Sequence, residues 1–158
     1  MYQGKLSEYF EADHDRLDNL FKDFQRMKRT DYPAAKESFK QFKFGLQRHI
    51  VWEEEVLFPL FENKTGMKTG GPTFVMRIEH RQIGDYLEDI HKKVQVADPE
   101  SDEEEKQLLA VLASHNQKEE HILYPAIDNI AGEADKRAAF EAMENMPQER
   151  YAVCCKSA

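Results

Sequence analysis

Hydrophobic residues recur along most of this chain at alternating steps of three and four, which is the spacing of one face of a packed α-helix. Proline and glycine interrupt the pattern near residues 33, 70–72, 99 and 132. The stretches between these interruptions predict four long helices and one short helix. Their expected ranges are 4–29, 33–63, 72–96 and 101–131 for the long helices and 133–144 for the short one.

Sequential helices that are joined by short loops pack antiparallel to each other. We therefore expect an all-α fold, an up-down-up-down antiparallel four-helix bundle with a short C-terminal helix and a tail. The chain has 158 residues, which is the size of one ordinary domain and enough to bury a core without disulfides. The expected domain covers residues 1–146, and the tail covers residues 147–158.

The hydrophobic face of each long stretch includes one histidine, and two of these faces also include a glutamate one turn later. The steps of three and four continue past these residues, to Val56 and Leu60 in the second stretch and to Ile122 and Ala126 in the fourth. The polar residues are therefore expected to point toward the same interior as their apolar neighbours. They are His14, His49, Glu53, His80, His115 and Glu119.

Two of these candidates are carboxylates, and a buried carboxylate without a positive partner costs roughly several kcal/mol. No lysine or arginine lies near Glu53 or Glu119 on these faces, so the positive charge must come from elsewhere. Taken singly, a histidine on an apolar face is more often an ordinary core residue, and a His-x-x-x-Glu pair is often a surface pair. The coincidence on all four faces favours a metal site over these interpretations.

The chain contains an internal repeat that relates the candidates to one another. Residues 49–59 and residues 115–125 both read His-x-x-x-Glu-Glu-x-apolar-Leu-aromatic-Pro. The same offset relates the Asp-His pair at 13–14 to the Glu-His pair at 79–80. Two similar helical hairpins are therefore predicted, and a pseudo-twofold pairing of the hairpins would bring two similar half-sites face to face.

The predicted ligand set contains imidazoles and carboxylates but no thiolate, which fits iron well. Two histidines can serve each metal, while each glutamate can bridge both metals. We therefore expect two iron ions joined by an oxo or hydroxo bridge, with positions left for a small molecule. Zinc and manganese are alternative metals.

Four short motifs along the chain are Asp13-His14-x-x-Leu17, His49-x-x-x-Glu53 with the following Glu-Glu-Val-Leu-Phe-Pro, Glu79-His80, and His115-x-x-x-Glu119 with the following Glu-His-Ile-Leu-Tyr-Pro. Together they resemble the hemerythrin-like (HHE cation-binding) family over about residues 4–130. The resemblance implies a four-helix bundle around a non-haem di-iron centre with bridging carboxylates and a bridging oxygen. It also implies a protein that binds dioxygen, nitric oxide or peroxide, or that senses iron.

The sequence departs from the oxygen-carrying hemerythrins, which have five histidines, two of them one helical turn apart. Here Met76 and Gly84 stand one turn from His80. Gly84 either relieves packing or leaves a gap beside the metals for a small ligand. The set of four histidines and two glutamates looks more like the repair-of-iron-centres proteins, so reversible oxygen transport is not the expected function.

The expected function is the binding of a small diatomic ligand or peroxide for sensing, scavenging or storage. The alternatives are a di-iron redox enzyme that reduces nitric oxide or peroxide, an iron donor for the repair of iron centres, and a structural bundle in which the metal is incidental. Adjacent Cys154 and Cys155 are either inert thiols in the tail or a redox or metal-transfer pair.

Composition and charge exclude several classes of partner. The formal net charge is -8 and no basic stripe is present, so nucleic acid is not an expected partner. No stretch approaches the roughly 18 apolar residues of a membrane span. The acidic first residues do not resemble a signal peptide, and a cytoplasmic location is therefore expected. We expect His91 to lie at the boundary of the core, His121 to lie at the surface, and Trp52 and Phe58 to pack in the interior.

Overall fold

The computed structural model describes residues 4–152, and within them it contains helices and no strand, which confirms the all-α prediction. The predicted ranges agree with the observed helices within two residues at each end. Two π-helical turns, Glu53–Leu57 and Glu119–Leu123, join α2 to α3 and α5 to α6. The helices are α1 (Leu6–Met27), α2 (Tyr32–Trp52), α3 (Phe58–Thr65), α4 (Pro72–Gln95), α5 (Asp102–Lys118), α6 (Tyr124–Ile130) and α7 (Glu133–Asn145).

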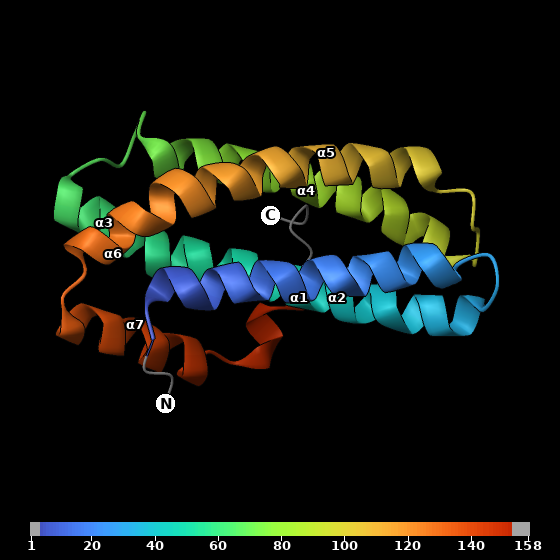
Figure 1. The fold of residues 1–158 in the computed structure, drawn as a ribbon, viewed down its shortest axis with the longest axis horizontal. Helices are drawn as coiled ribbons and strands as arrows, with labels where there is room; N and C mark the ends of the chain where they lie inside the picture. Colours follow the sequence, from blue (N-terminus) through green and yellow to red (C-terminus); the bar gives the residue numbers. More distant parts are fainter. Residues whose placement is uncertain (1–3, 153–158) are drawn as a thin grey trace.

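The long helices are arranged as two hairpins that lie against each other along the long axis of the molecule (Figure 1). α1 and α2 form one hairpin and α4 and α5 form the other, and the helices of each hairpin contact each other most extensively. α3 and α6 continue α2 and α5 at the same end of the molecule, where α7 also lies (Figure 1). This pairing agrees with the two hairpins that the internal repeat predicts.

The core consists of two apolar clusters that occupy different lengths of the same helices. One cluster contains Phe10, Phe58 and Phe140 and lies toward the end that carries α3, α6 and α7. The other contains Phe24 and Leu87 and lies toward the α1–α2 and α4–α5 turns. Along each of the four long helical segments, the predicted polar residues fall between the two clusters. The fold therefore encloses them with apolar side chains on both sides.

The π-helical turns change which residues face inward, and here the sequence prediction was wrong. Ile122 was expected to be buried, but its side chain is 62% exposed, and Val56 is only partly buried. The residues that follow them, Leu57 and Leu123, are each 1% exposed. A π turn contains one residue more than an α turn, so it advances the inward face by one position along the sequence.

The two prolines that follow the π turns explain why the turns form there. Pro59 and Pro125 lack the N–H group that would complete an α-helical hydrogen bond. The preceding residues, Phe58 and Tyr124, donate their N–H groups to the carbonyl oxygens of Glu53 and Glu119, five residues back. Each helix is therefore wider over one turn, and it continues past its proline instead of ending there.

The hairpins are also joined by a buried ion pair near their turns. The Lys28 ammonium group is 2.5 Å from Glu105 Oε2 and also contacts Asp102. Lys28 and Glu105 are 3% and 2% exposed. Ser101 donates its hydroxyl to the same Glu105 oxygen at 2.5 Å, so the buried carboxylate has several partners from the chain itself.

The segment after α7 packs onto the helices. A 3₁₀ turn, Gln148–Arg150, precedes Tyr151, whose hydroxyl accepts a hydrogen bond from Trp52 Nε1 at 2.7 Å. The predicted tail thus contains a buried residue, Tyr151. Cys154 and Cys155 lie outside the described residues. Within residues 4–152, no helix combines the length and apolar character that crossing a membrane requires.

Candidate metal centre

The structure brings all six predicted residues together in the middle of the molecule. His14 lies on α1, His49 on α2, His80 on α4 and His115 on α5. The two glutamates are the first residues of the two π turns. Each of the six side chains is 5% exposed or less, and both glutamates are 0% exposed. The predicted interior position is therefore confirmed for His14, His49, Glu53, His80, His115 and Glu119.

The six side chains form two half-sites that share the carboxylates. In the first half-site, His14 Nε2 is 3.2 Å from Glu119 Oε1 and His49 Nε2 is 3.6 Å from Glu53 Oε2. In the second half-site, His80 Nε2 is 3.1 Å from Glu53 Oε1 and His115 Nε2 is 3.2 Å from Glu119 Oε2. Each glutamate therefore directs one oxygen to each half-site.

Four further carboxylates surround the centre and hold the outer nitrogens of the imidazoles. Within each hairpin, His49 Nδ1 is 2.9 Å from Asp13 and His115 Nδ1 is 2.9 Å from Glu79. Between the hairpins, the Nδ1 atoms of the other two imidazoles make the same type of contact. His14 Nδ1 is 2.7 Å from Glu120 Oε2, and His80 Nδ1 is 2.6 Å from Glu54 Oε2.

These outer contacts decide which nitrogen faces the centre. An imidazole that donates its Nδ1–H to a carboxylate presents the lone pair of Nε2 on its other side. All four Nε2 atoms of the two half-sites then face the shared glutamates. Sequence reasoning did not assign these carboxylates, although the repeat contains all four of them, as the acid before the first histidine and as the second Glu of each Glu-Glu pair.

The ionisation of the buried groups shows that the centre favours positive charge. Burial lowers the pKa of His49, but the charge of Glu53 and the hydrogen bond with Asp13 outweigh this effect and raise the pKa to about 10. Burial likewise opposes a charged His80, whose hydrogen bonds with Glu53 and Glu54 raise its pKa to about 9. Burial alone would raise the pKa of Glu53, yet the charge of His49 and its hydrogen bonds hold that pKa well below its usual range.

The residues present fit a metal cation. Among the described residues, no lysine or arginine forms an ion pair with Glu53 or Glu119. Glu119 Oε2 is buried and accepts no hydrogen bond within residues 4–152, although His115 Nε2 lies 3.2 Å away. A lone pair and a carboxylate oxygen at that distance need a positive charge between them. Two groups of side chains meet the spacing of a metal site: Glu53, His80, His115 and Glu119, and His14, His49 and Glu119.

A seventh polar group lies in the centre, and sequence reasoning missed it. The Tyr124 hydroxyl donates a hydrogen bond to Glu53 Oε2 at 2.6 Å and is 3.1 Å from Glu119 Oε1. Burial and the charges of the two glutamates raise the pKa of Tyr124 well above its ordinary value. The available signal was the aromatic position of the repeat, which is Phe58 in the first copy and Tyr124 in the second.

A small cavity of about 10 Å³ adjoins the centre and is lined by His14, His49, His115 and Glu119 together with apolar residues such as Leu46 and Ile83. This is room for about one water-sized molecule. Gly84, the sequence candidate for a gap beside the metals, is buried but is not among the residues that line this cavity.

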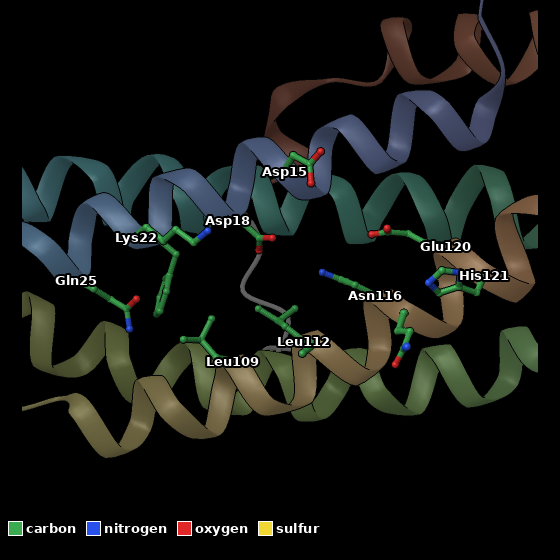
Figure 2. Close-up of a pocket in the computed structure, with 12 residues that line it drawn as sticks. Asp15, Asp18, Lys22, Gln25, Leu109, Leu112, Asn116, Glu120 and His121 are labelled. Carbon is green, nitrogen blue, oxygen red and sulfur yellow. The ribbon is translucent and has the colours of Figure 1, made fainter.

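A larger cleft of about 470 Å³ lies between α1 and α5 and faces solvent. Figure 2 shows Asp15 and Asp18 on one side of it, Asn116 on the other, and Glu120 and His121 near one end. Asp18, Leu112 and Asn116 line both the cleft and the small cavity. These three residues therefore stand between solvent and the buried centre.

The residues that the sequence analysis did not assign to the metal site lie outside the six-residue cluster. His91 contacts Glu88 at 3.0 Å and stacks on Phe39, and His121 is exposed at the cleft. Trp52 packs in the apolar cluster near α7. Phe58 packs there too, but it also stacks over His80, with ring centroids 5.6 Å apart.

Curated relatives match parts of the chain. A protein named DNA nickase from Nostoc sp. is 28% identical over 148 residues, which are 92% of this chain and 40% of that protein. Proteins named iron-sulfur cluster repair protein YtfE match over 54 residues, or 34% of this chain and 24% of each of those proteins. Their identity is 37% in Yersinia pseudotuberculosis and 35% in Yersinia pestis. The chain thus spans less than half the length of these relatives.

No solved structure matches the chain. The family model described as hemerythrin HHE cation binding domain matches residues 5–127, which include all six predicted metal ligands and Tyr124. The chain therefore belongs to the hemerythrin family, whose HHE domain binds metal cations.

Proposed function

We propose that this protein is a non-haem di-iron protein that binds dioxygen, nitric oxide or peroxide for sensing, scavenging or storage. Its long helices form an up-down-up-down four-helix bundle around the centre. His14 and His49 bind one iron, and His80 and His115 bind the other. Glu53 and Glu119 bridge the two ions, which also share an oxo or hydroxo bridge.

The division of each carboxylate between the half-sites carries this proposal. Glu53 Oε1 and Oε2 lie near different imidazoles, at 3.1 Å from His80 Nε2 and 3.6 Å from His49 Nε2. Glu119 is divided in the same way between His14 and His115, at 3.2 Å in both cases. A single ion would leave one oxygen of each glutamate and two imidazoles without a cation, whereas two ions serve every one of these atoms.

The donor types favour iron among the metals that the geometry admits. Four imidazole nitrogens and four carboxylate oxygens give each ion a mixed nitrogen and oxygen environment without sulfur. When bound, iron supplies redox chemistry and coordination positions that the protein leaves free. The outer carboxylates hold each imidazole in one orientation and increase its basicity.

The surroundings of the centre favour a very small ligand. The apolar clusters above and below it exclude bulk water, and the adjoining cavity has a volume of only about 10 Å³. Dioxygen, nitric oxide and peroxide are close to a water molecule in size, whereas an organic substrate is much larger. The cleft between α1 and α5 adjoins this cavity at Asp18, Leu112 and Asn116, which line both.

An iron donor for the repair of iron centres, or a di-iron enzyme that reduces nitric oxide or peroxide, is the second candidate function. The matches to the YtfE repair proteins of Yersinia favour the repair role, although they cover 34% of this chain. The net charge of -8 supports the prediction that nucleic acid is not a partner, so the function in the Nostoc relative's name is not proposed for this chain.

The test is metal analysis and visible absorption of protein purified without added metal. Two irons per chain and an oxo-to-iron absorption that changes with azide, nitric oxide or dioxygen are expected. A colourless protein, or bound iron that ignores all three ligands, would contradict the small-ligand function. Transfer of its iron to an apo-cluster protein, in the absence of any ligand response, would favour the repair function instead.

A further inference from the structure

The two half-sites are related by the internal repeat, and one hydroxyl group breaks their equivalence. Phe58 and Tyr124 occupy the same repeat position, and each is the first residue after a π turn. Phe58 stacks over His80 with ring centroids 5.6 Å apart, and Tyr124 stacks over His14 at 5.7 Å. The two rings are therefore placed alike, and only the ring of the first half-site carries an oxygen.

That oxygen has four neighbours, and all four are predicted ligand atoms of the first half-site. It lies 2.6 Å from Glu53 Oε2, 3.1 Å from Glu119 Oε1, 3.2 Å from His49 Nε2 and 3.3 Å from His14 Nε2. Neighbouring ligands of an octahedral ion with bonds of about 2.1 Å are about 3.0 Å apart. The distances from the hydroxyl oxygen to these four atoms are therefore close to those between neighbouring ligands of one ion.

The second half-site offers no equivalent atom. Phe58 has no polar group, and Met76, which precedes His80 by one turn, packs in the apolar cluster near α7. The first half-site thus presents five protein atoms to an ion, namely two nitrogens, two carboxylate oxygens and the phenol oxygen. The second presents four, which are two nitrogens and two carboxylate oxygens.

We propose that the Tyr124 oxygen is a direct ligand of the iron at His14 and His49. The proposal rests on the di-iron function and gives the two ions different numbers of protein ligands. On iron binding, the phenol O–H bond breaks, a lone pair of the oxygen forms the bond to iron, and the proton leaves to solvent.

The alternative role of the hydroxyl is to position a bridging carboxylate. Tyr124 donates a hydrogen bond to Glu53 Oε2 in this structure, and the same bond could persist in the loaded protein without any contact to iron. The two roles differ in spectroscopy rather than in stability. A phenolate bound to ferric iron gives a visible charge-transfer band and resonance-enhanced ring vibrations, whereas a phenol that only donates a hydrogen bond gives neither.

The experiment compares the wild type with Tyr124→Phe, with Phe58→Tyr and with the double exchange, all loaded with ferric iron. Iron per chain, visible absorption and resonance Raman spectra are measured. We expect two irons in every protein. The phenolate band is expected in the wild type, absent from Tyr124→Phe, stronger in Phe58→Tyr, and restored in the double exchange.

Failure of this inference is distinguishable from failure of the di-iron function. A wild-type protein that binds no iron contradicts the function itself. Two bound irons without a phenolate band, or a band that survives in Tyr124→Phe, would overturn the ligand role of Tyr124. If Tyr124→Phe does not fold, wild-type protein grown with ring-deuterated tyrosine decides the matter, since the Raman lines of a bound phenolate must shift and their failure to shift contradicts the proposal.

Discussion

Buried acidic side chains at two places in the described part of the chain are neutralised in different ways. Near the interhelical turns, Glu105 is 2% exposed and lies 2.5 Å from the ammonium group of Lys28. In the middle of the molecule, Glu53 and Glu119 are 0% exposed and meet imidazoles and one phenol. The chain supplies its own permanent cation at the first cluster, whereas at the second it supplies groups that bind one.

This contrast separates a structural ion pair from a metal centre. A buried ion pair is complete once both partners are in place, and breaking it leaves an uncompensated charge. The central cluster is complete only when a cation joins it, because imidazole nitrogens and carboxylate oxygens are both electron-pair donors. Only the central cluster should therefore respond to metal, and substitutions in each cluster provide controls for the other.

Replacing a bridging carboxylate is expected to have the largest effect. Glu53→Ala removes an oxygen from both half-sites, so the protein should lose most of its iron and its visible absorption. Glu105→Ala is the matched control, since it removes an equally buried carboxylate that has no part in the centre. That variant should lose a few kcal/mol of unfolding free energy because Lys28 loses its buried partner, yet it should keep two irons. Metal analysis and thermal unfolding measure both results.

Metal removal should weaken the protein through one cluster only. A ligand at a free concentration of 100 times its dissociation constant adds about 2.7 kcal/mol to the unfolding free energy. Iron should therefore raise the melting temperature of the wild type and of Lys28→Ala, and it should not raise that of Glu53→Ala. An equal rise in all three proteins would show that iron acts elsewhere on the chain.

Replacing an outer carboxylate is expected to have a smaller effect than replacing a bridging carboxylate. Asp13→Asn and Glu79→Gln each weaken the orientation of one imidazole, that of His49 and of His115 respectively. Loss of such a partner typically lowers metal affinity about 10–100-fold. Competition with a chelator measures the change. Glu104 forms an ion pair with Lys93 instead of contacting an imidazole of the centre. Glu104→Gln is therefore the control and should leave the metal affinity unchanged.

The smallest expected effect concerns access to the centre rather than the centre itself. Leu112 lines both the cleft and the inner cavity, whereas Leu109 lines the cleft alone. Leu112→Trp should slow azide or nitric oxide binding severalfold without changing the iron content. Leu109→Trp should leave both the binding rate and the iron content unchanged. Stopped-flow absorption measures these rates, and equal rates in the two variants would place the route elsewhere.

The helices and the six buried residues could be predicted from the sequence because both depend on periodicity. A face that repeats at three and four steps identifies a helix, and His49 or Glu119 stands out on it because polar groups are rare there. The same assumption of regular periodicity failed beyond Glu53 and Glu119. A π turn contains one residue more than an α turn, and nothing in the amino-acid composition marks it. Regular periodicity therefore predicted that Ile122 is buried, although it is 62% exposed.

The outer carboxylates and Tyr124 could not be predicted for a different reason. Asp13, Glu54 and Glu79 lie at the edge of the helical faces, where acidic residues are ordinary, and only the fold shows that each one meets an imidazole from another helix. Tyr124 comes directly after the second π turn, so a regular helical periodicity predicted that its ring faces away from the interior. The repeat marked its position, but the hydroxyl gains its role only when the two hairpins face each other.

The central claim is that two cations occupy the cluster of His14, His49, Glu53, His80, His115 and Glu119, and Mössbauer spectroscopy of ⁵⁷Fe-loaded protein tests it most directly. Two irons per chain that are magnetically coupled through shared carboxylates are predicted, with both signals lost in Glu53→Ala. A single uncoupled iron, or iron that remains bound after that substitution, would contradict the account.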